Sequence, residues 1–327
     1  MTLARTLAAA VLAAGVFAAS AALAQTYPNH PITLIVPFPP GGATDAIARI
    51  IQDPLQKALG QPIVVENIGG AGGMIAADKA AHATPDGYTI LIHQVALAAG
   101  MTLYKKDLNF DAAKDFATIG LVNNSASTWA ARPDLPANNF DELLRWMRQP
   151  GQSVKIGHAG VGSYSHLVGV MIAQELGAKA TQVPYRGAGP AMIDLLAGQV
   201  DLSSIAAVVA APLIKEGKLK AYAIIGDTPY SGLPQLKTFG ELGYKKLDVD
   251  FWHMLLVPAV TPRPIIDKIN AALRTALADQ KVQKIFAESG MQQFPADQET
   301  PEAAGSLLKR EITLWGDVIR ANNITGQ

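Results

Sequence analysis

Short apolar runs alternate with stretches of helical periodicity along most of the chain. Residues 32–36 form a continuous apolar run between prolines, which is typical of a strand buried on both faces. Apolar side chains then recur at helical spacing from Ala46 to Leu59, and Gly60 ends that segment. Pro54 interrupts the helical pattern, so we expect a kink or an early end of the helix there.

The same alternation continues toward the C-terminus. It predicts further strands at residues 62–65, 88–93, 154–156, 181–184, 200–203, 219–225 and 251–257. It predicts helices between and after them at residues 74–83, 165–176, 190–197, 208–216, 264–278, 282–289 and 301–321. Strands that alternate with helices of this length indicate an α/β fold with a parallel sheet covered by helices on both faces.

Two distant segments share one pattern of strand, glycine-bearing loop and helix start. They read ITLIVPFPPGGAT at residues 32–44 and VKIGHAGVGSYS at residues 154–165. Each places unpaired backbone N–H groups and the positive end of a helix dipole at one point, which favours a bound anion. Either loop alone could be no more than a tight turn. Two of them in one alternating chain favour two facing lobes with a ligand between them.

The composition narrows the kinds of partner and chemistry. The 327 residues carry 27 basic and 27 acidic side chains, so the chain has no basic surplus of the kind that binds nucleic acid. The absence of cysteine excludes disulfides, a thiol nucleophile and cysteine-ligated metals. The six histidines show no close metal-ligand spacing, and we expect neither a metal nor a cofactor.

Residues 1–24 have the pattern of a secretory signal. Arg5 is their only charge, an uncharged stretch follows, and Ala22-Leu23-Ala24 is a small-x-small cleavage pattern before Gln25. A membrane anchor is the alternative, but the stretch consists largely of alanine, which is weakly hydrophobic. We therefore expect a cleavable signal and a periplasmic protein.

Catalytic and nucleotide-binding motifs are incomplete. Ser163, Ser165 and His166 could indicate nucleophilic catalysis, but neither serine has glycine two residues before and after it, as a nucleophile elbow requires. Gly160-Val161-Gly162 begins like a dinucleotide fingerprint, whose third glycine would fall at Ser165. We expect Ser163 to cap a helix or to donate to a ligand. A secreted hydrolase or isomerase that uses the same cleft stays open as the alternative.

Several motifs resemble the Bug-type solute receptors of tripartite tricarboxylate transporters. The resemblance covers essentially the whole chain after the signal, in the family order. It rests on YPNHPITLIVPFPPGGATDAIAR (27–49), VVENIGGAGGMIAADKAAHATPDGYTIL (64–91), GHAGVGSYSHLVG (157–169), VPYRGAGPAMIDLLAGQVDL (183–202) and LVPAVTPRPIIDKIN (256–270).

The resemblance implies a two-lobed periplasmic binding protein of type II topology. Lobe one would comprise residues 25–123 and 250–327, and lobe two residues 124–249. Crossover segments near residues 119–122 and 251–257 would form the hinge. Such receptors are monomers that close on a small organic acid and deliver it to the membrane subunits of a transporter. Presentation of the loaded receptor to a sensor kinase is the other role that the sequence leaves open.

In this family, ligand carboxylates are held largely by loop N–H groups, hydroxyls and water. Carried over to this chain, the resemblance implies ligand-binding residues in the first loop, the second loop and the VPY-basic-G motif. These are Phe38, Gly41, Gly42, Ala43, Thr44 and Asp45; Gly160, Gly162, Ser163 and His166; and Tyr185, Arg186 and Gly187. Asp45 could instead cap the first helix or orient the ligand loop, and Arg186, where relatives usually have lysine, could be a solvated loop charge.

The ligand itself is less defined by the sequence. Relatives that bind amino acids tend to have an acid shortly after the VDL strand, whereas this chain has Ser203-Ser204-Ile205-Ala206. We expect a di- or tricarboxylate gripped at both ends. A receptor for an aromatic monocarboxylate is the alternative, with an apolar wall of Phe38, Tyr164, Tyr185 and Trp252. We expect His253 to pack between the lobes rather than face the cleft.

Overall fold

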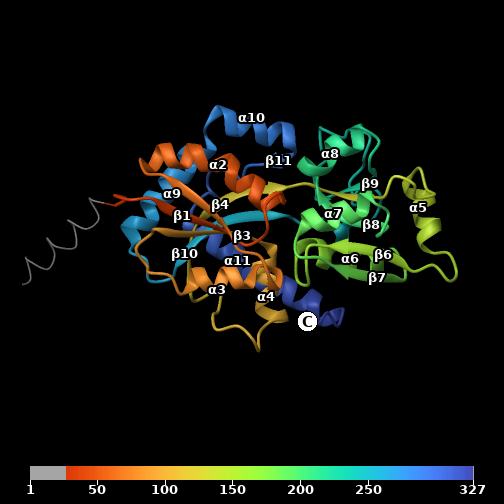
Figure 1. Cartoon of the computed structure of the whole chain (residues 1–327), viewed down its shortest axis with the longest axis horizontal. Helices are drawn as coiled ribbons and strands as arrows, with labels where there is room; N and C mark the ends of the chain where they lie inside the picture. The colour runs from red at the N-terminus through yellow and green to blue at the C-terminus, as the bar shows by residue number, and fades with distance from the viewer. Residues whose placement is uncertain (1–26, 327) are drawn as a thin grey trace, which may run out of the picture.

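The computed structural model describes residues 27–326, so the predicted signal at residues 1–24 lies outside the described residues. The described chain forms two lobes, each built on its own sheet, which lie side by side in Figure 1. The strands of the first sheet run in the order β11 (Met291–Gln292), β4 (Phe116–Ser125), β10 (Trp252–Pro258), β3 (Thr89–Gln94), β1 (Ile32–Val36) and β2 (Ile63–Asn67). Those of the second sheet run β7 (Ala180–Pro184), β6 (Val154–His158), β8 (Leu202–Ala206), β5 (Ser127–Ala131) and β9 (Lys220–Ile225).

Helices cover both faces of the first sheet. On one face apolar residues of three helices pack together, namely α2 (Ala43–Leu59), α9 (Arg263–Leu277) and α10 (Gln280–Ser289). On the other face lie α3 (Met74–Ala81), α4 (Val95–Leu103) and α11 (Pro301–Ala321). The second sheet carries α5 (Phe140–Met147), α6 (Tyr164–Glu175), α7 (Ala188–Leu196) and α8 (Ala207–Lys215). The predicted α/β architecture is therefore confirmed. No helix between residues 27 and 326 has the length and apolar character needed to cross a membrane.

The prediction of a parallel sheet is wrong in part. Strand β10 runs antiparallel to β3 and β4, and β5 runs antiparallel to β8 and β9. The short strand β11 is also antiparallel to β4. The pairs β1–β2, β1–β3, β6–β7 and β6–β8 are parallel. Strands β5 and β10 each directly adjoin a crossing between the lobes, so the chain enters each sheet there from the opposite direction.

Helix α2 continues through Pro54 to Leu59, so the early end is wrong, while a kink at this position stays a prediction. Proline removes one helical hydrogen bond, but the apolar stripe of α2 is fully buried on both sides of it, at Ile47, Ile51 and Leu55. Burial of this stripe against α9 stabilises the helix more than the lost hydrogen bond costs.

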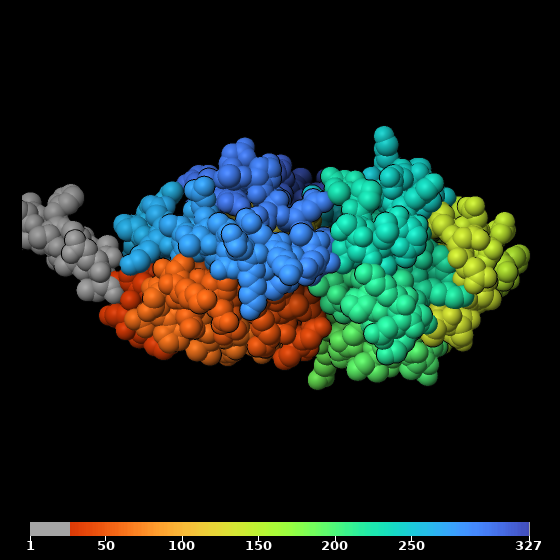
Figure 2. All heavy atoms as spheres, turned by 90° about the horizontal axis from the view of Figure 1, so that it is seen from above, coloured from red at the N-terminus to blue at the C-terminus, as the bar shows by residue number. Residues whose placement is uncertain are grey.

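The chain crosses between the lobes twice. The first crossing is at Ala126, between β4 and β5, and the second runs through residues 226–251, which include the short helix η2 (Lys245–Leu247). The segment at residues 119–122, expected at a crossing, instead lies within β4 and pairs with β10. The exact lobe boundaries at residues 123/124 and 249/250 stay a prediction. Figure 2 shows the two lobes pressed together along their junction.

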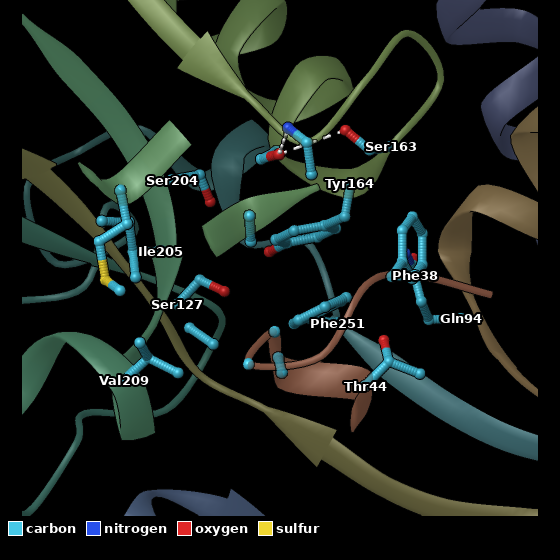
Figure 3. Close-up of a pocket in the computed structure, with 18 residues that line it drawn as sticks. Phe38, Thr44, Gln94, Ser127, Ser163, Tyr164, Ser204, Ile205, Val209 and Phe251 are labelled. Carbon is cyan, nitrogen blue, oxygen red and sulfur yellow. Dashed lines mark hydrogen bonds between the residues drawn. The ribbon is translucent and has the colours of Figure 1, made fainter. Parts of the chain in front are cut away.

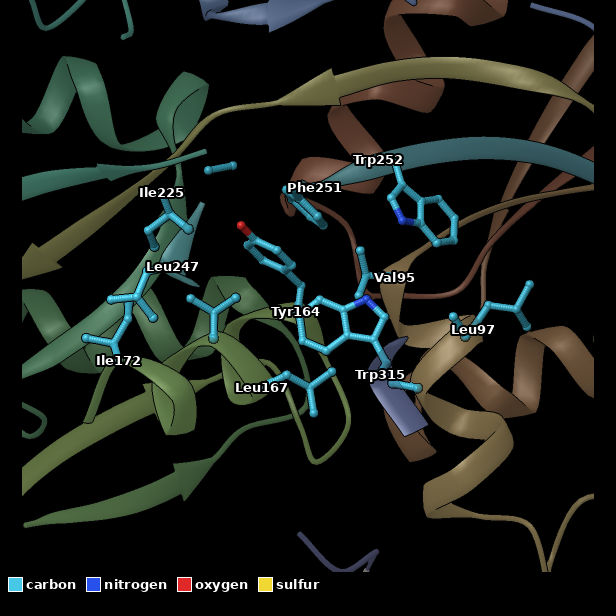
Figure 4. Close-up of a cluster of buried hydrophobic side chains, with 14 of the residues drawn as sticks. Val95, Leu97, Tyr164, Leu167, Ile172, Ile225, Leu247, Phe251, Trp252 and Trp315 are labelled. Carbon is cyan, nitrogen blue, oxygen red and sulfur yellow. The ribbon is translucent and has the colours of Figure 1, made fainter. Parts of the chain in front are cut away.

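Apolar packing also continues across the junction. Tyr164 of α6 stacks on Phe251, with ring centroids 4.3 Å apart. Figure 4 shows this pair between residues of the second lobe, such as Leu167, and the indoles of Trp252 and Trp315 in the first. Both indole N–H groups donate to one carboxylate oxygen of Glu311, each at 2.8 Å, which ties β10 to α11.

Candidate functional site

A cavity opens where the two lobes meet, and residues from both lobes line it (Figure 3). The empty space there, open solvent included, is about 650 Å³. Six of the predicted ligand-binding residues line it: Phe38, Gly41, Gly42, Ala43, Thr44 and Ser163. A ligand in this cavity would therefore contact both lobes.

The first lobe presents the N-terminus of α2 to the cavity. Gly42 is the N-cap residue and offers no capping side chain, and no described residue accepts a hydrogen bond from the N–H groups of Ala43 and Thr44. Gly41 has a φ of +89°, a conformation that strongly favours glycine. The loop thus turns so that free backbone donors and the positive helix end meet the cavity.

Asp45 holds this loop in place from behind. Its carboxylate accepts hydrogen bonds from the N–H of Gly41 at 3.0 Å, from Arg49 Nε at 3.1 Å and from Asn67 Nδ2 at 2.9 Å. Burial would raise the pKa of Asp45, but the hydrogen bonds from Arg49, Gly41 and Asn67 hold it below its usual value. Asp45 does not line the cavity, so its placement fits the alternative of orienting the loop.

The second lobe presents the N-terminus of α6. Ser163 is the N-cap residue, and its hydroxyl accepts from the N–H of His166 at 3.3 Å. The same hydroxyl lies 3.2 Å from the hydroxyl of Ser165, which accepts from the N–H of Ala159 at 3.0 Å. This network, part of which is dashed in Figure 3, fixes the loop and leaves the first N–H groups of α6 without helical partners at the cavity.

Two neutral histidines support that loop from the side away from the cavity. Nδ1 of His158 accepts from the N–H of Gly160 at 3.3 Å, and Nδ1 of His166 accepts from the N–H of Gly162 at 3.1 Å. Burial, with the neighbouring His166 as a second cause, lowers the pKa of His158 to about 3. Burial lowers the pKa of His166 to about 4. The His166 ring thus binds loop backbone and does not pair with the Ser163 hydroxyl as a general base would.

The remaining predicted residues lie around the cavity rather than in it. Gly160, Tyr185 and Arg186 line an adjoining hollow at its mouth, together with Phe38. Gly187 caps α7 and lies against Pro39 of the opposite lobe, where a Cβ would come within 3.0 Å of the proline ring. Gly162 lies behind the cavity with Asp45 and His166. A role of these residues in binding stays a prediction.

Several lining residues did not emerge from the sequence. They are Gln94, Ser127, Ala159, Ala188, Met192, Ser204, Ile205, Ala206, Val209 and Phe251. Tyr164, expected in an apolar wall, also lines the cavity, as does Ser165, which the sequence offered only as a catalytic serine. The prediction that Trp252 belongs to that wall is wrong. Trp252 is fully buried against α11, and Phe251 lines the cavity instead. His253 is buried outside the cavity, with Nε2 3.1 Å from the Thr44 hydroxyl.

Among the described residues that line the cavity, none carries a formal charge. Phe38, Tyr164, Phe251 and Ile205 give it largely apolar walls. An anion in this cavity would therefore be held by helix N-termini, backbone N–H groups and hydroxyls rather than by ion pairs.

The comparisons with known proteins agree with this geometry. A family model described as the tripartite tricarboxylate transporter family receptor matches residues 47–324. Protein BugT of Bordetella pertussis is 34% identical over 315 residues, which are 94% of this chain and 95% of that protein. The chain belongs to this receptor family.

Solved structures of related receptors share the whole fold. The periplasmic binding protein BugD is 36% identical with a TM-score of 0.87, and the match covers 92% of this chain and all of that one. MatC of Rhodopseudomonas palustris with bound malate is 34% identical with a TM-score of 0.84, over 90% of this chain and all of that one. These relatives are solute-binding proteins, so the receptor is not an enzyme, and the predicted two-lobed fold is confirmed.

Proposed function

We propose that this receptor captures a small di- or tricarboxylate in the periplasm and delivers it to the membrane subunits of a tripartite transporter. The observation that carries the proposal is the uncharged cavity between the lobes, which takes one helix N-terminus from each lobe. The malate found in MatC supports a carboxylate with two acidic ends. The pattern of residues 1–24 supports secretion, and we propose that the receptor acts as a monomer.

Calorimetric titration of the purified receptor with a panel of organic acids tests this proposal. We expect a dicarboxylate to bind more tightly than the monocarboxylate of the same chain length, because a monocarboxylate engages only one end. Hydrogen bonds to a charged group contribute about 1.5–3 kcal/mol each, so the expected difference is on the order of 10- to 1,000-fold in affinity. A receptor that binds no carboxylate at all would contradict the proposal.

An aromatic monocarboxylate is the second candidate ligand. The stacked rings of Tyr164 and Phe251, with Phe38 beside them, form an apolar wall against which an aromatic ring would pack. Benzoate that binds as tightly as terephthalate in the same titration would favour this candidate and would leave the receptor function intact.

A further inference from the structure

Two serine hydroxyls in the wall of the cavity have no hydrogen-bond partner within the described chain. They belong to Ser127 of β5 and Ser204 of β8, and the two residues are only 1% and 7% exposed. Buried hydroxyls are normally paired, because an unsatisfied one costs free energy. Both residues line the cavity, and Figure 3 shows their oxygens directed into the space bounded by Tyr164, Ile205 and Phe251.

The strand register places these hydroxyls on one face of the second sheet. Strands β5 and β8 are antiparallel, with Ser127 opposite Ala206 and Trp129 opposite Ser204, so the two serines are diagonal neighbours. Diagonal neighbours are about 7–8 Å apart, which is too far to pair with each other but close enough for one group to bridge them. The nearby Tyr164 hydroxyl donates to the carbonyl of Val249 at 3.1 Å, so toward Ser127 it can act only as an acceptor, and a ligand carboxylate would compete with it for the Ser127 proton.

The surroundings indicate what that bridging group is. Helix α8 begins at Ala207, directly after β8, and its residue Val209 also lines the cavity, so a third positive helix end, besides those of α2 and α6, lies beside the hydroxyls. Neither a basic nor an acidic side chain lines this wall among the described residues. Two hydroxyl donors beside a helix N-terminus match an acceptor with two oxygens and negative charge, which is a carboxylate.

We propose that Ser127 and Ser204 bind the second carboxylate of the ligand, while the N-terminus of α2 in the opposite lobe binds the first. This inference rests on the proposed receptor function and extends it to a subsite for the far end of a dicarboxylate. The subsite lies on the second sheet and is separate from the glycine-bearing loops that the sequence pointed to.

Paired ligands test the subsite. The receptor and its Ser127→Ala, Ser204→Ala and double variants are titrated by calorimetry with succinate, glutarate and adipate, and with butanoate, pentanoate and hexanoate. The dicarboxylate that the wild type binds best should lose affinity by roughly 10- to 150-fold for each serine removed, as expected for a hydrogen bond to a charged group. The monocarboxylate of the same length should lose little.

The ligand-free variants supply a second readout. Removal of an unpaired buried hydroxyl should raise the melting temperature of the empty receptor by about 1–4 °C, although it weakens binding. Thr261→Val is the matched control, because Thr261 is also buried with an unpaired hydroxyl but does not line the cavity. Thr261→Val should leave the affinities for the dicarboxylate and for the monocarboxylate unchanged.

The outcomes separate the subsite from the receptor function. Equal losses for dicarboxylate and monocarboxylate, or no loss for either, would overturn the subsite and leave the receptor function standing. A wild type that binds both ligands of a pair equally would do the same. A wild type that binds none of the acids would overturn the receptor function and the subsite with it.

Discussion

Some individual side chains in this receptor hold loop backbone in place and do not face the cavity. His158 and His166 lie with ring centroids 4.3 Å apart, and each accepts a hydrogen bond from a loop N–H through Nδ1. A protonated imidazole cannot accept at that nitrogen. The loop before α6 therefore keeps its shape only while both rings are neutral.

The free energy of unfolding should fall as the pH is lowered from 7 to 5. The pKa of His166 is about 4 in the folded receptor against 6.5 for an ordinary histidine, so the unfolded chain binds the proton first. We expect the free energy of unfolding to drop by roughly 1–2 kcal/mol for this histidine between pH 7 and pH 5. His166→Asn keeps an acceptor near the Nδ1 position without a titrating ring, so urea unfolding should show a shallower dependence on pH. Parallel curves for the two proteins would contradict this.

The residues predicted from the sequence have roles set by their neighbours in the chain. The residues that were missed have roles set by the pairing of distant strands. Ser163 was expected to cap a helix, and it does, because an N-cap depends only on its immediate neighbours. Ser127 and Ser204 lie in strands that are far apart in the sequence, and only the pairing of β5 with β8 places them together. Lone residues brought together by register leave no motif in a sequence.

At the scale of elements, the N-terminus of α2 is capped by Gly42, which has no side chain and lies close to the other lobe. A Cβ on Gly42 would lie 4.0 Å from the Cβ of Ala188 across the cavity and 3.9 Å from the carbonyl oxygen of Pro39. One methyl group therefore fits at this position, whereas a larger side chain would enter the space between the lobes.

This predicts a graded response at Gly42. Gly42→Ala should bind the best carboxylate within a few-fold of wild type, because its Cβ makes only ordinary contacts. Gly42→Val should lose on the order of 100-fold or more, since a branched side chain would block the backbone donors of α2. Calorimetry measures the affinity, and circular dichroism confirms that both variants are folded. Equal binding by Gly42→Val would show that the ligand does not approach this helix end.

Three of the elements that were missed lack one clear periodicity, whereas helix α5 was missed although Leu143, Trp146 and Met147 recur at helical spacing. Strands β4 and β5 read FATIGLVNNS and STWAA, whose small and polar residues are buried without forming an apolar run. Helix α4 reads VALAAGMTL and is almost entirely buried, so it shows no polar face to mark it as a helix. The strands before both glycine-bearing loops were predicted because buried parallel strands show as short, mostly apolar runs in a sequence.

Across the whole molecule, contacts from loop to loop hold the lobes together. The Tyr104 hydroxyl of the first lobe donates to the carbonyl of Val161 in the second at 2.7 Å. A Cβ on Gly72 would come within 2.7 Å of the same carbonyl oxygen. The lobes thus meet through backbone at a point beside the mouth of the cavity.

We expect ligand binding to close the lobes, and Tyr104→Phe to favour the open form. Without ligand, X-ray scattering should give this variant a larger radius of gyration than wild type. With saturating ligand the two radii should converge at a smaller value. Loss of one neutral hydrogen bond should cost about 2- to 10-fold in affinity. A radius that does not change under confirmed saturation would contradict closure.

The path of the chain through the two sheets also sets an order for folding. The strands of the second sheet come from one uninterrupted stretch, β5 to β9, whereas β10 lies between β3 and β4 in the first sheet and comes after that stretch. A chain that emerges from its N-terminus can therefore complete the second lobe while the first still lacks β10 and the helices that follow it. We expect the first lobe to fold last, with its apolar strands unpaired until the C-terminal segment arrives. While the chain folds, we expect that half-built sheet to be the part of the receptor most exposed to aggregation and proteolysis.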